Sequence, residues 1–178
     1  SCLKWQLFLK ETGSTISIFY LMKLYIIGYF FNTFAPSSLG GDVARSVMLG
    51  NKLQNKKNAY ATTFLERFTG LFALAFFGTI FTFSSIEIPL AFCLVIYAVF
   101  LITLFFTFVC FSKKISSHFF LFIARFTNRF QKLAGIFIKI EQAFEFAHGK
   151  KKLFIHSMFL SFFFHVLTVC NTFIAAKA

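Results

Sequence analysis

The sequence predicts an all-α membrane protein: a polytopic helical bundle of about four spanning or re-entrant helices, with one amphipathic helix at the membrane surface. Of the 178 residues, 58% are hydrophobic and 13% are charged, which leaves too little polar surface to cover a soluble domain of this size. The apolar residues gather in runs of about 20, the length that an α-helix needs to cross the hydrocarbon core of a bilayer. We expect these spans at about residues 16–34, 61–83, 88–111 and 153–176.

The two ends of this bundle are less sharply defined than its middle. The run at 16–34 has a second interpretation, a re-entrant hairpin with Gly28 and Asn32 near its turn. The chain opens on Ser1 and not on Met, and its last apolar run stops abruptly at Ala178. We therefore expect a fragment of a larger chain, with further membrane segments or another domain at one or both ends.

The basic residues indicate how the spans are oriented. Lys and Arg outnumber Asp and Glu by 18 to 6, but they collect between the apolar runs, as the positive-inside rule describes. This placement favours an anionic membrane surface as the partner and argues against nucleic acid. The link 84–87 has no Lys or Arg and should face away from the cytoplasm. The links 35–60 and 112–152 are rich in both and should face the cytoplasm, which predicts a multi-pass membrane protein.

Between the third and fourth spans, residues 115–147 have the pattern of one amphipathic helix. Large apolar residues recur there at steps of three and four: Phe119, Ile123, Phe126, Phe130, Leu133, Phe137, Ile140 and Phe144. Basic residues lie off this stripe. We expect the helix to rest in the cytoplasmic interface with its Phe face toward the acyl chains.

The most unusual stretch for a membrane chain is NTFAPSSLGGDVAR, residues 32–45. Pro36 should end the first helix, and the glycines that follow should permit a tight turn. A new helix is expected near Asp42, which would cap it. A helix start preceded by glycines suits an anion, and Arg45 can bind a phosphate with two hydrogen bonds. The same residues also fit an ordinary helix cap with a local ion pair, and the residue pattern leaves both interpretations open.

A second polar pair, Glu66 and Arg67, lies inside an apolar run, where charged side chains are costly. Neighbours in sequence point about 100° apart on a helix, so each should find its partner elsewhere. A crossed arrangement, Glu66 with Arg45 and Arg67 with Asp42, would neutralise all four charges; alternatively, one arginine stays free for a ligand phosphate. Gly70 should let a neighbouring helix approach closely. The candidate lipid-headgroup residues are Asn32, Gly40, Gly41, Asp42, Arg45, Glu66 and Arg67.

No pattern in the chain indicates catalysis, a metal or a cofactor. The nucleotide loops GxGxxG and GxxxxGK[ST], the zinc motif HExxH and the redox motif CxxC are missing from the sequence. His156 and His165 are nine residues apart, on opposite sides of a helix, so they should not share a metal ion. We expect no catalytic residue, no metal and no cofactor in this stretch of chain.

The stretches FFNTFAPSSLGGDVARSVML and AYATTFLERFTGLFAL together resemble the lysylphosphatidylglycerol synthase transmembrane region, or flippase-like domain, family. Its motif positions would be Asn32, Pro36, Gly40, Gly41, Asp42, Arg45, Arg67, Gly70 and Leu71. The motif resemblance runs from about residue 24 to 74 and implies an integral inner-membrane domain that moves aminoacylated phosphatidylglycerol between leaflets. The synthase activity of such proteins resides in a separate soluble domain, which nothing here resembles.

Two functions from different classes follow. The favoured one is a domain that binds and translocates an anionic or aminoacylated phospholipid. The alternative is a membrane scaffold for a fused or partner transferase that acts in phospholipid aminoacylation or polyprenyl-linked glycosylation. A membrane-embedded transferase with Glu66 or Asp42 as its base has the weakest support, because the sequence offers no second catalytic carboxylate.

Overall fold

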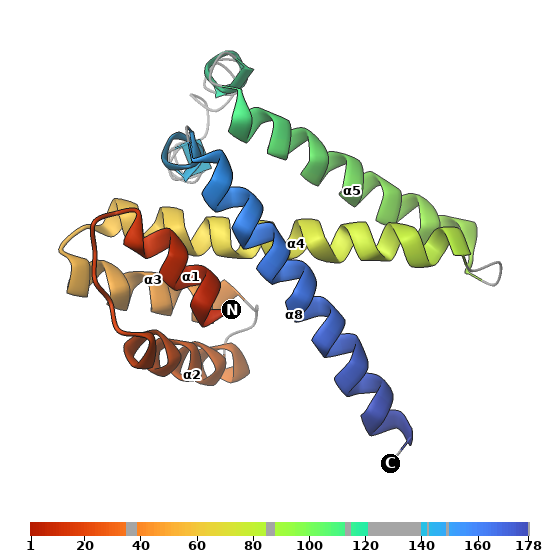
Figure 1. The fold of residues 1–178 in the computed structure, drawn as a ribbon, viewed down its shortest axis with the longest axis horizontal. Helices are drawn as coiled ribbons and strands as arrows, with labels where there is room; N and C mark the ends of the chain where they lie inside the picture. Colours follow the sequence, from red (N-terminus) through yellow and green to blue (C-terminus); the bar gives the residue numbers. More distant parts are fainter. Residues whose placement is uncertain are drawn as a thin grey trace.

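The computed structural model describes residues 1–34, 39–84, 88–112, 115–120, 140–141, 143–148 and 150–177, and within them every regular element is an α-helix (Figure 1). The all-α prediction is confirmed. The main helices are α1 (Cys2–Lys10), α2 (Ile18–Phe34), α3 (Leu39–Leu53), α4 (Lys56–Ser84), α5 (Leu90–Phe111) and α8 (Lys151–Lys177).

Helices α4, α5 and α8 are each long and apolar enough to cross a membrane. They contain most of the runs expected at 61–83, 88–111 and 153–176. Helix α4 begins five residues before its apolar run because the Asn55 side chain accepts a hydrogen bond from the amide of Asn58, at 3.1 Å, and so caps the helix. Pro89 occupies the N-cap of α5, where its missing amide hydrogen is no loss.

Helices α2 and α3 form an antiparallel pair. Helix α2 is continuous through Gly28 and Asn32, so the hairpin turn considered at those residues does not occur there. The residues between these two helices, 35–38, include Pro36 and lie outside the described residues. Seventeen residues give α2 a length of about 26 Å, slightly short of the hydrocarbon core. Its crossing of the membrane stays a prediction.

Helix α3 starts at Leu39, earlier than the predicted start near Asp42. Asp42 therefore lies in the first turn and is not the cap. In this earlier turn the amide of Gly41 donates a hydrogen bond to Asn32 Oδ1 of α2, at 2.7 Å, so it has a partner outside its own helix. The turn also crosses α2 closely, because a Cβ on Gly41 would collide with the carbonyl oxygen of Gly28 and with the Asn32 side chain. Two glycines at one crossing let the helix backbones approach closely.

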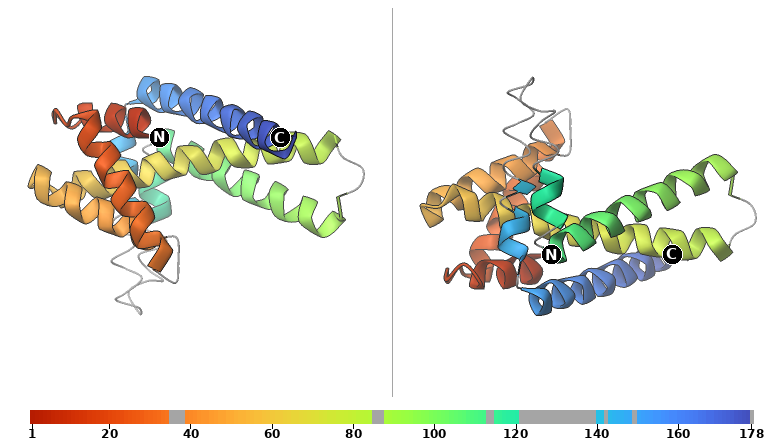
Figure 2. Two further views of the ribbon diagram at one scale, coloured as in Figure 1. Left: turned by 90° about the horizontal axis from the view of Figure 1, so that it is seen from below. Right: turned by 90° about the horizontal axis from the view of Figure 1, so that it is seen from above.

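Helix α1, for which the sequence carried no prediction, lies against α2, α4 and α8. Trp5 and Leu9 pack with Leu21 and Leu24 of α2 in one buried cluster. Phe8 belongs to a second buried cluster. The short amino-terminal helix thus joins both apolar cores. Figure 2 shows α1, α2 and α3 gathered around one end of α4, with the rest of α4 and α5 extending away from them.

The second core consists largely of phenylalanine rings from α4, α5, α8 and the described ends of segment 115–147. Phe144 is fully buried and lies against Phe64, Phe68 and Phe106. Phe120 is also buried. The predicted apolar stripe therefore packs on protein at its described ends, where we had expected contact with acyl chains. Residues 121–139, the middle of the predicted amphipathic helix, lie outside the described residues.

Ion pairs collect at one end of the bundle. Lys57 at the start of α4 pairs with Glu145 at 3.6 Å, and Lys150 before α8 pairs with Glu11 after α1 at 3.4 Å. The exposed Lys151 and Lys152 follow at the start of α8. Lys57, Glu145 and the lysines at 150–152 belong to the links that the sequence places on the cytoplasmic side, whereas Glu11 precedes the first expected span and belongs to neither link. The orientation of the spans stays a prediction.

The glycine crossing leads to a stability prediction. Gly41→Ala should lower the free energy of unfolding by about 1–3 kcal/mol, because the new methyl group meets backbone that cannot move freely. Gly70→Ala is the matched control, since its Cβ would meet only the Lys4 ammonium at an ordinary 3.5 Å. Thermal midpoints of the two purified variants in detergent measure the difference. Equal midpoints would show that the crossing is looser than described.

Candidate functional site

Charged side chains from α1, α3 and α4 meet at one place inside the bundle. The four that the sequence singled out converge: Arg45 Nη2 lies 3.8 Å from Glu66 Oε2, and Arg67 Nη2 lies 2.7 Å from Asp42 Oδ1. These are the two pairs of the crossed arrangement expected from the sequence.

Asp42 holds both arginines through a single oxygen. Its Oδ1 accepts hydrogen bonds from Arg45 Nη2 at 2.5 Å, from Arg67 Nη2 at 2.7 Å and from Arg67 Nε at 3.2 Å. Its position in the first turn of α3 also favours a negative charge, because the amino-terminal end of a helix dipole is positive. Asp42 thus ties α3 to α4 and partly neutralises two cations.

The Arg45 guanidinium is enclosed by aromatic rings and by the close crossing of α2. Its Cζ lies 4.1 Å from the ring centroid of Tyr25 and 5.0 Å from that of Trp5, within the range of cation–π attraction. The stem of the side chain runs past Gly28, where a Cβ would come within 2.8 Å of Arg45 Cδ. Arg45 is only 1% exposed. It is therefore a fixed, buried cation.

Lys4 of α1 is a member of the cluster that the sequence did not reveal. Its Nζ lies 3.6 Å from Glu66 Oε1 and donates a 2.9 Å hydrogen bond to Ser161 Oγ of α8. Burial lowers the pKa of this ammonium, and the Glu66 carboxylate opposes that shift. The one signal in the sequence was a lysine beside Trp5 in an otherwise apolar stretch, and nothing in that pattern identified a partner 62 residues away.

Three of the candidate headgroup residues have structural surroundings different from those expected. The backbone amide of Gly41 donates to Asn32 Oδ1 at 2.7 Å, so this amide is already occupied and is not presented to an anion. Asn32 acts as a side-chain partner for the start of α3. Gly40 lies in the first turn of that helix and not in a turn that precedes it.

The cluster has more cations than carboxylates, and some of its buried polar atoms have no hydrogen-bond partner among the described residues. The cations of Lys4, Arg45 and Arg67 outnumber the carboxylates of Asp42 and Glu66 by one. Within the described residues, Arg45 Nη1, Glu66 Oε2 and Tyr25 Oη are buried without a hydrogen-bond partner. Such atoms are expensive to leave unsatisfied. Arg67 is different, because half of its side chain (51%) is exposed.

Helix α8 borders the cluster through a row of polar residues spaced four apart. Ser157 Oγ donates to Thr69 Oγ1 at 3.2 Å, Ser161 accepts from Lys4, and His165 Nε2 donates to the Gly70 carbonyl oxygen at 3.0 Å. Gly70 had been expected to admit a neighbouring helix. Its missing side chain instead leaves space beside the Lys4 ammonium and an accessible carbonyl for His165. Within the described residues, no group of His, Cys, Asp and Glu could hold a metal ion.

Three helices long and apolar enough to span a bilayer, α4, α5 and α8, define an integral, multi-pass membrane domain. Its charged cluster joins α4 to α1 and α3 inside the bundle. The sequence model of the lysylphosphatidylglycerol synthase TM region matches residues 1–178, the whole chain. The protein belongs to that family, and its likeness to the family extends well beyond the motifs between residues 24 and 74. No curated protein and no solved structure matches the chain at a significant level.

The cluster predicts that its buried and its half-exposed carboxylate–cation contacts differ in strength. Glu66→Gln should lower the free energy of unfolding by about 3–5 kcal/mol, because Lys4 stays buried without a counterion and Arg45 keeps only Asp42. Arg67→Gln should lower it by less than about 1 kcal/mol, because Arg67 is half exposed. Unfolding curves of both variants in detergent test this. A loss for Arg67→Gln as large as that for Glu66→Gln would contradict the assignment of a buried and an exposed side to the cluster.

Proposed function

We propose that the cluster binds the phosphodiester headgroup of an anionic or aminoacylated phospholipid, and that the domain moves this lipid between the leaflets of the inner membrane. The observation that carries the proposal is the surplus cation: three buried or half-buried cations face two carboxylates. One phosphodiester has a single negative charge and would restore neutrality. The unsatisfied Nη1 of Arg45 supplies a donor for it.

The family supports this choice of ligand. Its description names lysylphosphatidylglycerol synthase, an activity whose lipid product has a phosphodiester and amino groups. An amino group would suit the Glu66 carboxylate, whose Oε2 lacks a hydrogen-bond partner among the described residues. The phosphodiester of such a headgroup would face the surplus cation, and one of its amino groups would face the Glu66 carboxylate.

The two arginines would have different roles in binding. Arg45 is held by Tyr25, Trp5 and Asp42 and would remain in place. Arg67 shares the same Asp42 oxygen but is half exposed, so its guanidinium can exchange Asp42 for a phosphate at the surface of the cluster. This exchange keeps each charge paired while the headgroup enters, and paired charges lower the cost of a polar group at membrane depth.

The alternative function, a scaffold for a fused or partner transferase, is favoured by a different observation. Asp42 and Glu66 connect α1, α3 and α4 through ion pairs within the chain. Such a network can stabilise the arrangement of the bundle without any ligand. The scaffold would then need the charges for stability only, and exchange at Arg67 would have no function.

A leaflet assay tests the proposal. The full-length protein is reconstituted in liposomes with headgroup-labelled phosphatidylglycerol, and the label that reaches the opposite leaflet is measured over time. Arg67→Ala should slow transfer at least tenfold, because the exchangeable cation is lost, and Arg67→Lys should restore part of the rate because a charge returns without the forked geometry.

Lys57→Ala is the matched control, since Lys57 is an exposed cation of the same helix that pairs with Glu145 outside the cluster. It should transfer lipid at the wild-type rate. If Arg67→Ala also transfers lipid at the wild-type rate at equal protein content, the proposal that lipid moves through the cluster is wrong. If that variant keeps the rate but lowers the output of an attached or partner transferase, the scaffold function is correct.

A further inference from the structure

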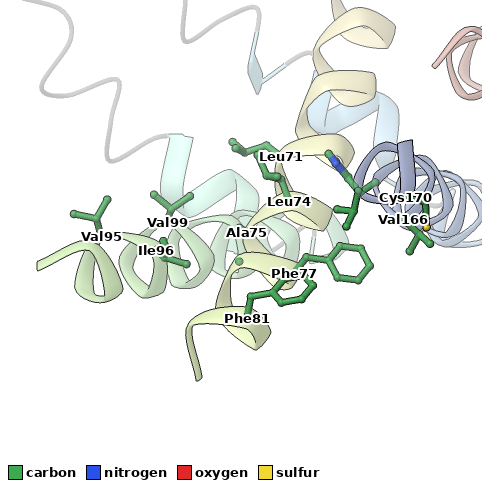
Figure 3. Close-up of a pocket in the computed structure, with 13 residues that line it drawn as sticks. Leu71, Leu74, Ala75, Phe77, Phe81, Val95, Ile96, Val99, Val166 and Cys170 are labelled. Carbon is green, nitrogen blue, oxygen red and sulfur yellow. The ribbon is translucent and has the colours of Figure 1, made fainter. Parts of the chain in front are cut away.

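A groove of about 550 Å³ lies between α4, α5 and α8 (Figure 3). Its α4 side includes Ala75 and Gly78, whose small size leaves the space open. Val95 and Val99 line it from α5, and Val166 lines it from α8. The lining is hydrocarbon apart from the imidazole of His165 and the thiol of Cys170. A polar ligand would find almost no hydrogen-bond partner in this groove.

The groove begins where the charged cluster ends. His165 lines it and donates a hydrogen bond to the carbonyl oxygen of Gly70. A Cβ on Gly70 would lie 3.5 Å from the Lys4 ammonium, so this glycine borders the cluster. The next residue, Leu71, is the first of the α4 residues that line the groove. One face of α4 thus passes from charge to hydrocarbon within a single turn.

We propose that this groove holds an acyl chain of the same phospholipid whose headgroup binds the cluster. The inference rests on the proposed function and adds the site of the lipid's apolar part. From Leu71 to Phe81 the groove follows ten residues of α4, or about 15 Å. That is half of the roughly 30 Å hydrocarbon core, the depth of the acyl chains of one leaflet. The polar end and the apolar length agree with one amphipathic molecule.

The lining of the groove favours an acyl chain as its occupant. An acyl chain is flexible and carries no polar group, so it can follow the hydrocarbon lining from Leu71 to Phe81. The end of the chain nearer the headgroup would lie beside His165, next to the cluster.

Photolabelling with two lipid probes tests the assignment. The full-length protein is placed in phosphatidylcholine bilayers that contain phosphatidylglycerol with a diazirine near the ester or at the chain end. After illumination, labelled residues are located by mass spectrometry. The near-ester probe should label the region of Leu71 and His165, and the chain-end probe the region of Phe81 and Val95. Excess unlabelled phosphatidylglycerol should reduce both signals at least fivefold, and added phosphatidylcholine should not.

Val169→Trp provides the matched variant, because Val169 lines the groove and its side chain is exposed enough to accept a larger one. It should reduce groove labelling at least fivefold, whereas Leu101→Trp, an exposed position of α5 outside the lining, should not. If Val169→Trp lowers the thermal midpoint, its loss of labelling could come from unfolding. The positions labelled by the two probes in the wild-type protein then test the acyl-chain site.

Two results would overturn the inference: labelling spread over the exposed helix faces without regard to diazirine position, or no labelling of the groove, which would show that protein covers it. Either result together with normal leaflet transfer leaves the proposed function intact and removes only the groove. If Arg67→Ala loses lipid transfer and the groove is not labelled, the headgroup site again stands and only the acyl-chain groove is wrong. Wild-type transfer rates in Arg67→Ala would instead contradict the headgroup site.

Discussion

The burial of Arg45 is the constraint on which the amino-terminal half of this protein depends. Moving a guanidinium out of water is unfavourable by several kcal/mol unless opposite charge and aromatic faces surround it. Asp42 provides charge from its own helix, Glu66 provides it from α4, and Tyr25 and Trp5 provide the rings. The space for the side chain comes from Gly28. Helices α1, α2, α3 and α4 thus each contribute to the environment of one cation.

Helix α4 connects this charged region with the apolar part of the molecule. Its 29 residues extend about 43 Å, longer than the hydrocarbon core. Glu66 and Arg67 lie in its first half, and the second half, with Ala75 and Gly78, lines a groove that is hydrocarbon apart from His165 and Cys170. A single helix therefore sets the distance between the polar cluster and the apolar groove. For an amphipathic ligand, this distance must match the separation of its polar and apolar parts.

The sequence predicted the features that follow from local pattern or from the cost of charge in lipid. Long apolar runs identified α4, α5 and α8, and the unmatched charges of Glu66 and Arg67 pointed to Asp42 and Arg45. Features that depend on contacts between residues far apart in the sequence were not predicted. Lys4 looked like an ordinary polar residue, because its partners Glu66 and Ser161 come from other helices. The early start of α3 was not predicted, because the partner of the Gly41 amide is Asn32 on another helix. The described ends of the phenylalanine stripe at 115–147 turned toward a protein core that hydropathy alone does not show.

The contact between Lys4 and Ser161 has a consequence for biosynthesis. These residues are 157 positions apart, and ribosomes add about 5–20 residues per second. The ammonium of Lys4 therefore exists for about 8–30 seconds before its hydroxyl partner has been made. During that interval α1 can dock on α2 but lacks the wall that α8 provides. Helix α1 is thus fully enclosed only after α8 has been made, although it is the first helix of this stretch to be synthesised.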